Sequence, residues 1–213
     1  MYPISGIALL VCVNGRLCFS ETPSSPVTWS QALHSVAKKL DLRFSLEFRV
    51  KEEETTNPLA NPIIIPDTIQ TKDDLMEFLR TSLPTADILV DQDAPRFIHI
   101  VEKGLSNDGN YSLNKKATLD VKGQLGNFIQ MVTQKSQGAI NFDTSSSLSN
   151  PVFIDKIPAA AVHAKDISYR SILSLAVEPD VEDALAWSAE RLIIKGKVDE
   201  VWVHYNSLPK TGH

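Results

Sequence analysis

The chain has 213 residues, 43% hydrophobic and 22% charged, which is typical of a globular protein able to bury a core without metal or disulfide staples. The net charge of −5 and the scattered placement of the 21 basic residues argue against nucleic-acid binding, because phosphate contacts need clustered Lys and Arg. No apolar run reaches the about 20 residues that cross a bilayer, so we expect no membrane span.

Residues 1–26 have two interpretations. Ile4–Val13 is an apolar run of signal-peptide length, and Cys18–Ser20 supplies small residues for a cleavage site, although no Lys or Arg precedes the run. Alternatively, Asn14-Gly15 is the turn of an N-terminal β-hairpin. In that hairpin the two cysteines point to opposite faces, so we expect neither a disulfide nor a redox or metal site.

Residues 27–103 predict a first unit of helix, strand, strand, helix and hairpin. Its first helix places Trp29, Leu33, Val36 and Leu40 on one face. Residues 42–50 then alternate apolar and polar side chains, which predicts a half-buried strand with its polar side toward solvent.

The second half of this unit begins with a short strand at Ile63–Ile65. Thr71 is the expected N-cap of the next helix, whose apolar face includes Leu79. Ile88–Val90 and Arg96–Ile100 predict a β-hairpin. His99 alternates with two isoleucines there, so we expect it on the opposite face from them, in a structural or solvated role.

Residues 104–116 are rich in Gly, Ser and Asn and predict a linker before a second unit at residues 117–205. This unit is expected to contain a strand at Ala117–Val121 and a helix whose apolar face includes Val132. A strand at Ile140–Phe142 and an extended segment at Ala159–Ala164 follow.

The end of the second unit is expected to repeat the helix and hairpin of the first. A helix from Tyr169 leads to Leu185–Trp187 and Arg191–Ile194, interpreted as two strands joined by a turn at Ser188–Glu190. Val201–Tyr205 adds one more alternating strand, and residues 206–213 form a C-terminal tail.

Three pairs of positions recur at a spacing of about 95 residues, the signature of an internal repeat: Val36 with Val132, Leu79 with Leu173, and Arg96 with Arg191. The predicted fold is therefore α+β, with two tandem α+β repeats. Each repeat is expected to have two helices packed on its own small antiparallel or mixed sheet.

This double pattern resembles the small α+β modules at the N-terminal ends of secretins and TonB-dependent receptors, the secretin and TonB short N-terminal domain class. The matching features are Leu125–Val132 with Gly138–Phe142, and the helix at Tyr169–Leu175 with the hairpin after it. The chain departs from the class in its long loop at residues 51–62, and no pore-forming segment follows. The resemblance implies a periplasmic or cell-envelope protein that binds partners through sheet edges or helix faces, and it supplies no catalytic residue.

No constellation in the sequence carries a recognisable chemistry. The histidines lack the spacing of a helical metal site, and the Gly-rich phosphate loop and the serine-hydrolase elbow are missing. The acidic cluster Glu178–Asp183 lacks the Gly of a calcium loop, so we do not expect it to bind calcium. We do not expect Asp91 and Asp93 to bind calcium either. Leu208–Gly212 matches a sortase recognition motif, but no apolar span follows it.

We therefore predict a non-catalytic, envelope-associated interaction or assembly module without catalytic, cofactor-binding or metal-binding residues. It is expected to bind a protein partner or itself by strand addition. The expected interaction strand consists of Val201, Trp202, Val203, His204 and Tyr205. The alternatives are a small intracellular, cytoplasmic enzyme or ligand-binding protein with a pocket between its two domains, and a structural subunit that oligomerises through the same strand. The sequence does not identify a small-molecule ligand.

Overall fold

A mixed β-sheet organises the computed structural model, which describes residues 29–51, 54–55, 58–59, 63–143, 158–177, 184–193 and 200–205. The helices are α1 (Trp29–Leu40), α2 (Lys72–Ser82), the 3-10 helix η1 (Ser112–Asn114), α3 (Leu125–Lys135) and α5 (Tyr169–Val177). The strands are β1 (Arg43–Lys51), β2 (Glu54–Thr55), β3 (Ala86–Val90), β4 (Phe97–Glu102), β5 (Lys116–Gln124), β6 (Ile140–Phe142), β7 (Pro158–Ser168), β8 (Leu185–Leu192) and β9 (Glu200–Tyr205).

The main sheet has the strand order β3-β4-β1-β8-β9-β6, with β2 added to β1, and β5 pairs with β7 in a separate antiparallel ribbon. The β3–β4 and β8–β9 pairs are antiparallel, whereas β4–β1, β1–β8 and β9–β6 are parallel. The α+β class is confirmed. The expectation of a separate sheet for each half was wrong. The strands of both halves belong to one sheet, because β1 of the first half pairs with β8 of the second.

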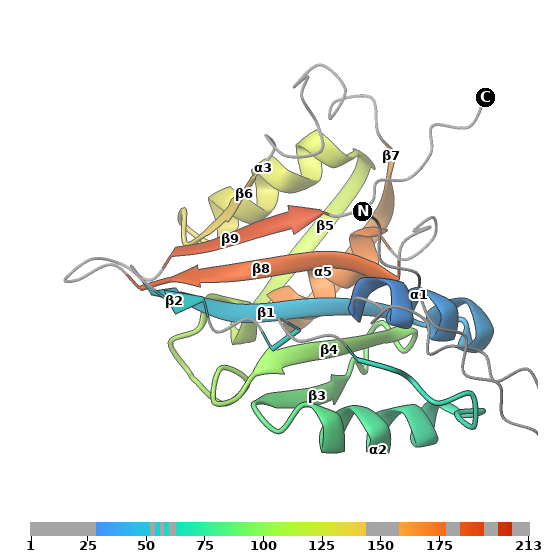
Figure 1. Ribbon diagram of the computed structural model, residues 1–213. Coiled ribbons are helices and arrows are strands. Elements are labelled where there is room, and N and C mark those ends of the chain that lie inside the picture. The colour runs from blue at the N-terminus through green and yellow to red at the C-terminus, as the bar shows by residue number, and fades with distance from the viewer. Residues whose placement is uncertain are drawn as a thin grey trace, which may run out of the picture.

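Different elements pack on the two faces of the sheet (Figure 1). One hydrophobic cluster joins α1 and α2 to one face, where Phe44, Ile98 and Ile100 are buried. The other joins α3, α5 and the β5–β7 ribbon to the opposite face, where Phe97 and Val101 are buried. Neighbouring residues of β4 point to opposite faces and both faces are packed, so this strand is buried on both sides.

Several predicted elements are present where the sequence placed them. The α1 face is buried, with Leu33 fully enclosed. Thr71 caps α2 through a reciprocal capping box, in which its side chain accepts the Asp74 backbone N–H and the Asp74 carboxylate accepts the Thr71 N–H. The predicted hairpin at residues 88–100 is the β3–β4 pair.

The second predicted hairpin is wrong. Residues 185–192 form one continuous strand, β8, which pairs antiparallel with β9. The polar residues read as a turn, Ser188 and Glu190, are the outward-facing positions of an alternating strand. Arg96 and Arg191 are therefore not equivalent, since one precedes β4 and the other lies near the end of β8.

Three further expectations need correction. Ile63–Ile65 does not form a strand. The polar side of β1 does not face solvent, because Ser45 and Glu47 are completely buried under the second half of the chain. The segment 104–116 connects the halves but also contributes buried core side chains, namely Leu105, Tyr111 and Leu113. Residues 1–26 and 206–213 lie outside the described residues.

Candidate functional site: a helix-free sheet face and a buried polar network

A chain of hydrogen bonds runs through the interior where the two halves meet. Ser45 of β1 and His99 of β4 are direct neighbours in the parallel register, and the Ser45 hydroxyl lies 2.6 Å from His99 Nδ1. His99 Nε2 lies 2.9 Å from Oδ2 of Asp91, at the end of β3. All three residues are buried, and His99 faces away from Ile98 and Ile100, as the alternation predicted.

Asp91 is the most heavily hydrogen-bonded member of this chain. Its Oδ1 accepts the backbone N–H groups of Asp93 and Ala94 at 2.9 and 3.0 Å, and the hydroxyl of Ser171 on α5 at 2.9 Å. Burial raises the pKa of Asp91, but the hydrogen bonds from His99, Ala94 and Ser171 outweigh it and hold the pKa below its ordinary value. The ionised carboxylate can only accept, so His99 Nε2 donates to it, which leaves Nδ1 for the contact with the Ser45 hydroxyl.

A Ser–His–Asp chain can serve nucleophilic catalysis, but this one lacks access. Catalysis requires the hydroxyl to reach a substrate, and Ser45 is fully buried on a central strand of the sheet. The histidine also presents Nδ1 to the serine and Nε2 to the aspartate, the reverse of the catalytic arrangement. The geometry therefore supports a structural role, linking β1, β3, β4 and α5.

A buried ion pair lies beside this chain. Arg170 of α5 donates from Nε and Nη2 to the two carboxylate oxygens of Glu47 on β1, at 2.6 and 2.8 Å, and from Nη2 to Asn114 Oδ1 at 2.9 Å. Glu47 is 0% exposed and Arg170 is 8% exposed. Burial lowers the pKa of Arg170, but the Glu47 carboxylate more than offsets this and holds the pKa above its ordinary value. This bidentate pair connects α5 of the second half to β1 of the first half.

The network meets the surface at a cleft of about 360 Å³ between the two halves. Asp91 and His99 form part of its floor, and Arg170 and Ser171 contribute from α5. Exposed Asp93, Lys116 and Asp166 stand at its margins, so its wall carries both signs of charge. In the sequence, Asp91 was considered only as a calcium ligand. Its bonds to Asp93, Ala94 and His99 are close in sequence, but Ser171, which joins it to the second half, lies 80 positions away.

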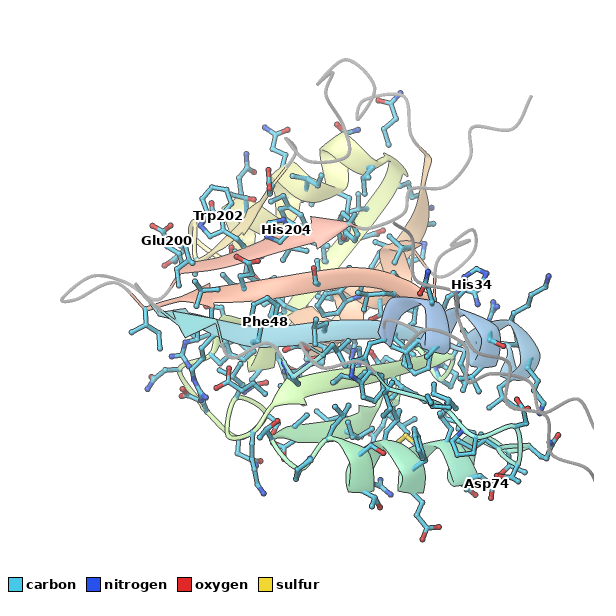
Figure 2. All side chains as sticks on the ribbon, viewed as in Figure 1. His34, Phe48, Asp74, Glu200, Trp202 and His204 are labelled. Carbon is cyan, nitrogen blue, oxygen red and sulfur yellow. The ribbon has the colours of Figure 1, made fainter. Side chains whose placement is uncertain are left out.

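The predicted interaction strand is β9, and it lies inside the sheet. Val201–Val203 pair with β8 on one side and with β6 on the other, so strand addition is not available along this stretch. Val201, Val203 and Tyr205 are buried against the second-half core. Trp202 and His204 alternate with them, lie on the opposite face and are half-buried (Figure 2).

Trp202 and His204 belong to a half-buried surface that none of the described helices covers, because α1 reaches only the beginning of β8 (Figure 1). We call this surface the helix-free face; it consists of Asn141, Ser188, Glu190, Leu192, Trp202 and His204. His204 Nδ1 lies 3.2 Å from Asp143 Oδ2, and Trp202 Nε1 donates to Glu200 Oε2 at 3.3 Å. A tryptophan lying among charged and polar residues is a frequent feature of protein interfaces.

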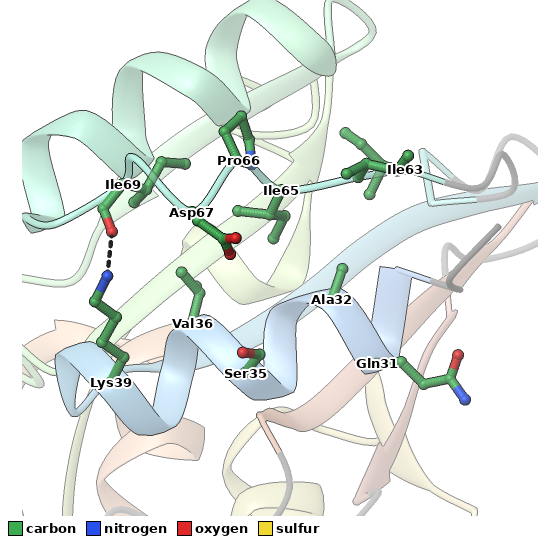
Figure 3. Close-up of a pocket in the computed structure, with 11 residues that line it drawn as sticks. Gln31, Ala32, Ser35, Val36, Lys39, Ile63, Ile65, Pro66, Asp67 and Ile69 are labelled. Carbon is green, nitrogen blue, oxygen red and sulfur yellow. Dashed lines mark hydrogen bonds between the residues drawn. The ribbon is translucent and has the colours of Figure 1, made fainter. Parts of the chain in front are cut away.

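Two smaller cavities lie elsewhere. One of about 210 Å³ lies between α1 and the segment at residues 63–69, and Lys39 Nζ donates to the Ile69 carbonyl oxygen at 2.8 Å beside it (Figure 3). Another, of about 220 Å³, is bordered by Lys115, Lys116 and Lys135. Among the described residues, no group of three or more His, Cys, Asp or Glu side chains is placed to hold a metal ion.

Comparison with protein-family models, curated proteins and solved structures yields no match to this chain. Within the described ranges, none of the helices has the length and apolar character needed to cross a membrane.

Proposed function

We propose that the protein is a non-catalytic interaction module of the cell envelope, built from two copies of one folding unit at residues 27–103 and 117–205. Support for the repeat comes from the strand order. The first half contributes β3-β4-β1 and the second β8-β9-β6, and in both an antiparallel hairpin is followed by a parallel pair. The helix, strand, helix and hairpin also follow one another in the same order in both halves.

The helix-free face is the surface through which we expect the protein to bind its partner. In the first half, the corresponding side of β4 and β1 is covered by α5. In the second half, Trp202 and His204 occupy a sheet face that none of the described helices covers. Large aromatic side chains on such a surface contribute strongly to binding when a partner desolvates them. A protein partner is therefore the ligand that this surface fits best.

The buried network supports a non-catalytic role because its reactive groups already bond one another. Both carboxylate oxygens of Asp91 accept hydrogen bonds from the protein, and Glu47 is neutralised by Arg170. Placement in the periplasm or envelope rests on the resemblance to secretin and TonB short N-terminal domains and on the apolar run Ile4–Val13.

Site-specific photo-crosslinking in the cells that make the protein tests this function. A benzophenone amino acid at position 204 should trap a protein in a discrete product, because this position lies on the helix-free face. The matched control places the same group at Gln130, an exposed residue of α3, which packs on the opposite side of the sheet. Equal labelling at both positions, or no product at position 204, would contradict the proposal.

The cleft between the halves favours a second candidate, the binding of a small polar molecule. Its volume of about 360 Å³ and its walls from both halves match the pocket that this alternative requires. Nuclear magnetic resonance spectra of the protein with a library of small polar metabolites would reveal it through shifts confined to Gln92, Asp93 and Ser168. An absence of such shifts at millimolar concentration would reject this candidate.

A further inference from the structure

The internal junction between the two halves describes how a second copy of this chain would dock on the helix-free face. At that junction β1 pairs with β8, and α5 of the second half lies over the first half. There, Arg170 binds Glu47 and Ser171 binds Asp91. This inference rests on the proposed function and on the repeat stated with it.

The strand registers identify the equivalent positions of the two halves. Ile98 and Ile100 of β4 face their own helices α1 and α2, as Val201 and Val203 of β9 face α3 and α5. His99 and Val101, on the other side of β4, therefore correspond to Trp202 and His204. The helix-free face is thus the second-half equivalent of the face that α5 covers in the first half.

Neighbouring strands follow the same correspondence. Ser45 lies opposite His99 in the β1–β4 register, and Asn141 lies opposite Trp202 in the β6–β9 register. β6 therefore corresponds to β1, and β8 corresponds to β3. Since β1 pairs with β8 inside the chain, the edge of β6 is expected to pair with β3 of another copy in the same parallel sense.

Both of these edges have backbone groups directed away from the sheet. Within the described ranges β3 pairs only with β4, and β6 pairs only with β9. Asp91 N bonds Phe97 O and Lys103 N bonds Thr85 O, so by alternation Ile88 and Val90 direct their backbone groups outward. Phe142 does the same on β6, because Asp143 N bonds Val203 O.

The relation between the halves also fixes the mode of assembly. β1 and β6 run in opposite directions, and the helices of the two halves lie on opposite faces of the sheet. A half-turn about an axis that lies in the sheet and crosses the strands, with a shift along that axis, relates one half to the other. Applying this operation twice leaves only the shift, so successive copies add head to tail and do not close into a two-fold dimer.

The element that would lie over the helix-free face is α2 of the incoming copy, because α2 corresponds to α5. Its exposed surface carries Asp73, Glu77 and Arg80. The helix-free face carries Glu190, whose Oε1 lies 3.9 Å from His204 Nε2, so an incoming Arg80 would add a second basic side chain beside this carboxylate. We propose that the helix-free face and the edge of β6 bind β3 and α2 of a second copy, and that copies assemble head to tail through this contact.

Sedimentation velocity over a concentration series tests the assembly with two complementary variants. Trp202→Glu blocks the helix-free face. Val90→Pro blocks the β3 edge, because it removes an outward N–H while leaving the bonds to β4 intact. Arg80→Glu is a second edge-side variant that does not alter the strand, and circular dichroism confirms that each variant is folded.

The wild-type protein should form species larger than dimers as concentration rises, and each variant alone should remain monomeric. Mixing Trp202→Glu with either edge-side variant should give a heterodimer and nothing larger, because only one intact face and one intact edge remain. A wild-type monomer at every concentration, dimers of a single variant, or a mixture without heterodimer would each overturn the proposal. If the wild type is monomeric while the crosslinker at position 204 traps a different protein, self-assembly fails and the interaction function stands.

Discussion

Replacing Arg170 by Met should lower the free energy of unfolding by about 3–5 kcal/mol, because it leaves a buried carboxylate without its counter-ion. The Glu47 side chain is completely enclosed, and both of its oxygens accept from Arg170. Water cannot replace the guanidinium without opening the contact between α5 and β1. Urea denaturation at neutral pH measures the loss, with circular dichroism and tryptophan fluorescence as independent probes of the same transition.

Two further variants establish that the effect belongs to the buried pair. Arg96→Met removes an arginine whose ion pair with Asp41 is exposed, and it should cost about 1 kcal/mol or less. The double variant Glu47→Met with Arg170→Met removes both charges and should regain most of the lost stability, because a buried ion pair is often replaceable by apolar groups of similar size. A cost for Arg170→Met no larger than that for Arg96→Met would show that Glu47 is not desolvated.

The local elements of this fold can be predicted from the sequence because their signals are local. The stripe of Trp29, Leu33 and Val36 marks α1, and Thr71 with Asp74 marks the start of α2. The β8 strand was predicted as two short strands joined by a turn, because its outward positions, Ser188 and Glu190, are polar and resemble a turn. Only the pairing of these two residues with β9 places them in a strand.

The buried network could not be predicted from alternation. Alternation assigns the polar side of β1 to solvent, but Ser45 and Glu47 are covered by a helix that follows more than a hundred residues later, with Arg170 separated from Glu47 by 123 positions. A buried charge is tolerated only when a partner satisfies it, and no local pattern records a partner at that distance. His99 was placed on the correct face, yet its hydrogen bonds to Ser45 and Asp91 depend on the same tertiary packing.

Asp91 is the second site where one substitution should have a large effect. Asp91→Ala leaves two backbone N–H groups, the Ser171 hydroxyl and the His99 ring without their shared acceptor. Each buried donor left without an acceptor is unfavourable, so the free energy of unfolding should fall by at least about 3 kcal/mol at neutral pH. Asp91→Asn should lower the free energy of unfolding by about 1–3 kcal/mol, because the amide keeps an acceptor oxygen while losing the charge.

The pH dependence of this difference follows from the lowered pKa of Asp91. The folded protein holds this pKa below the unfolded value of about 3.9, so the unfolded chain binds the proton first as pH falls. The stability that the ionised carboxylate contributes is therefore complete above about pH 5 and is lost as pH falls below about 4 toward the folded pKa. The difference in the free energy of unfolding between wild type and Asp91→Asn should be constant from pH 5 to 8 and should narrow in acid.

Asp166→Asn is the control, at an exposed carboxylate paired with Lys116, and should change the free energy of unfolding by less than about 1 kcal/mol. A gap that widens toward acid would mean that Asp91 is neutral in the folded protein and that the assigned direction of its hydrogen bond with His99 is wrong.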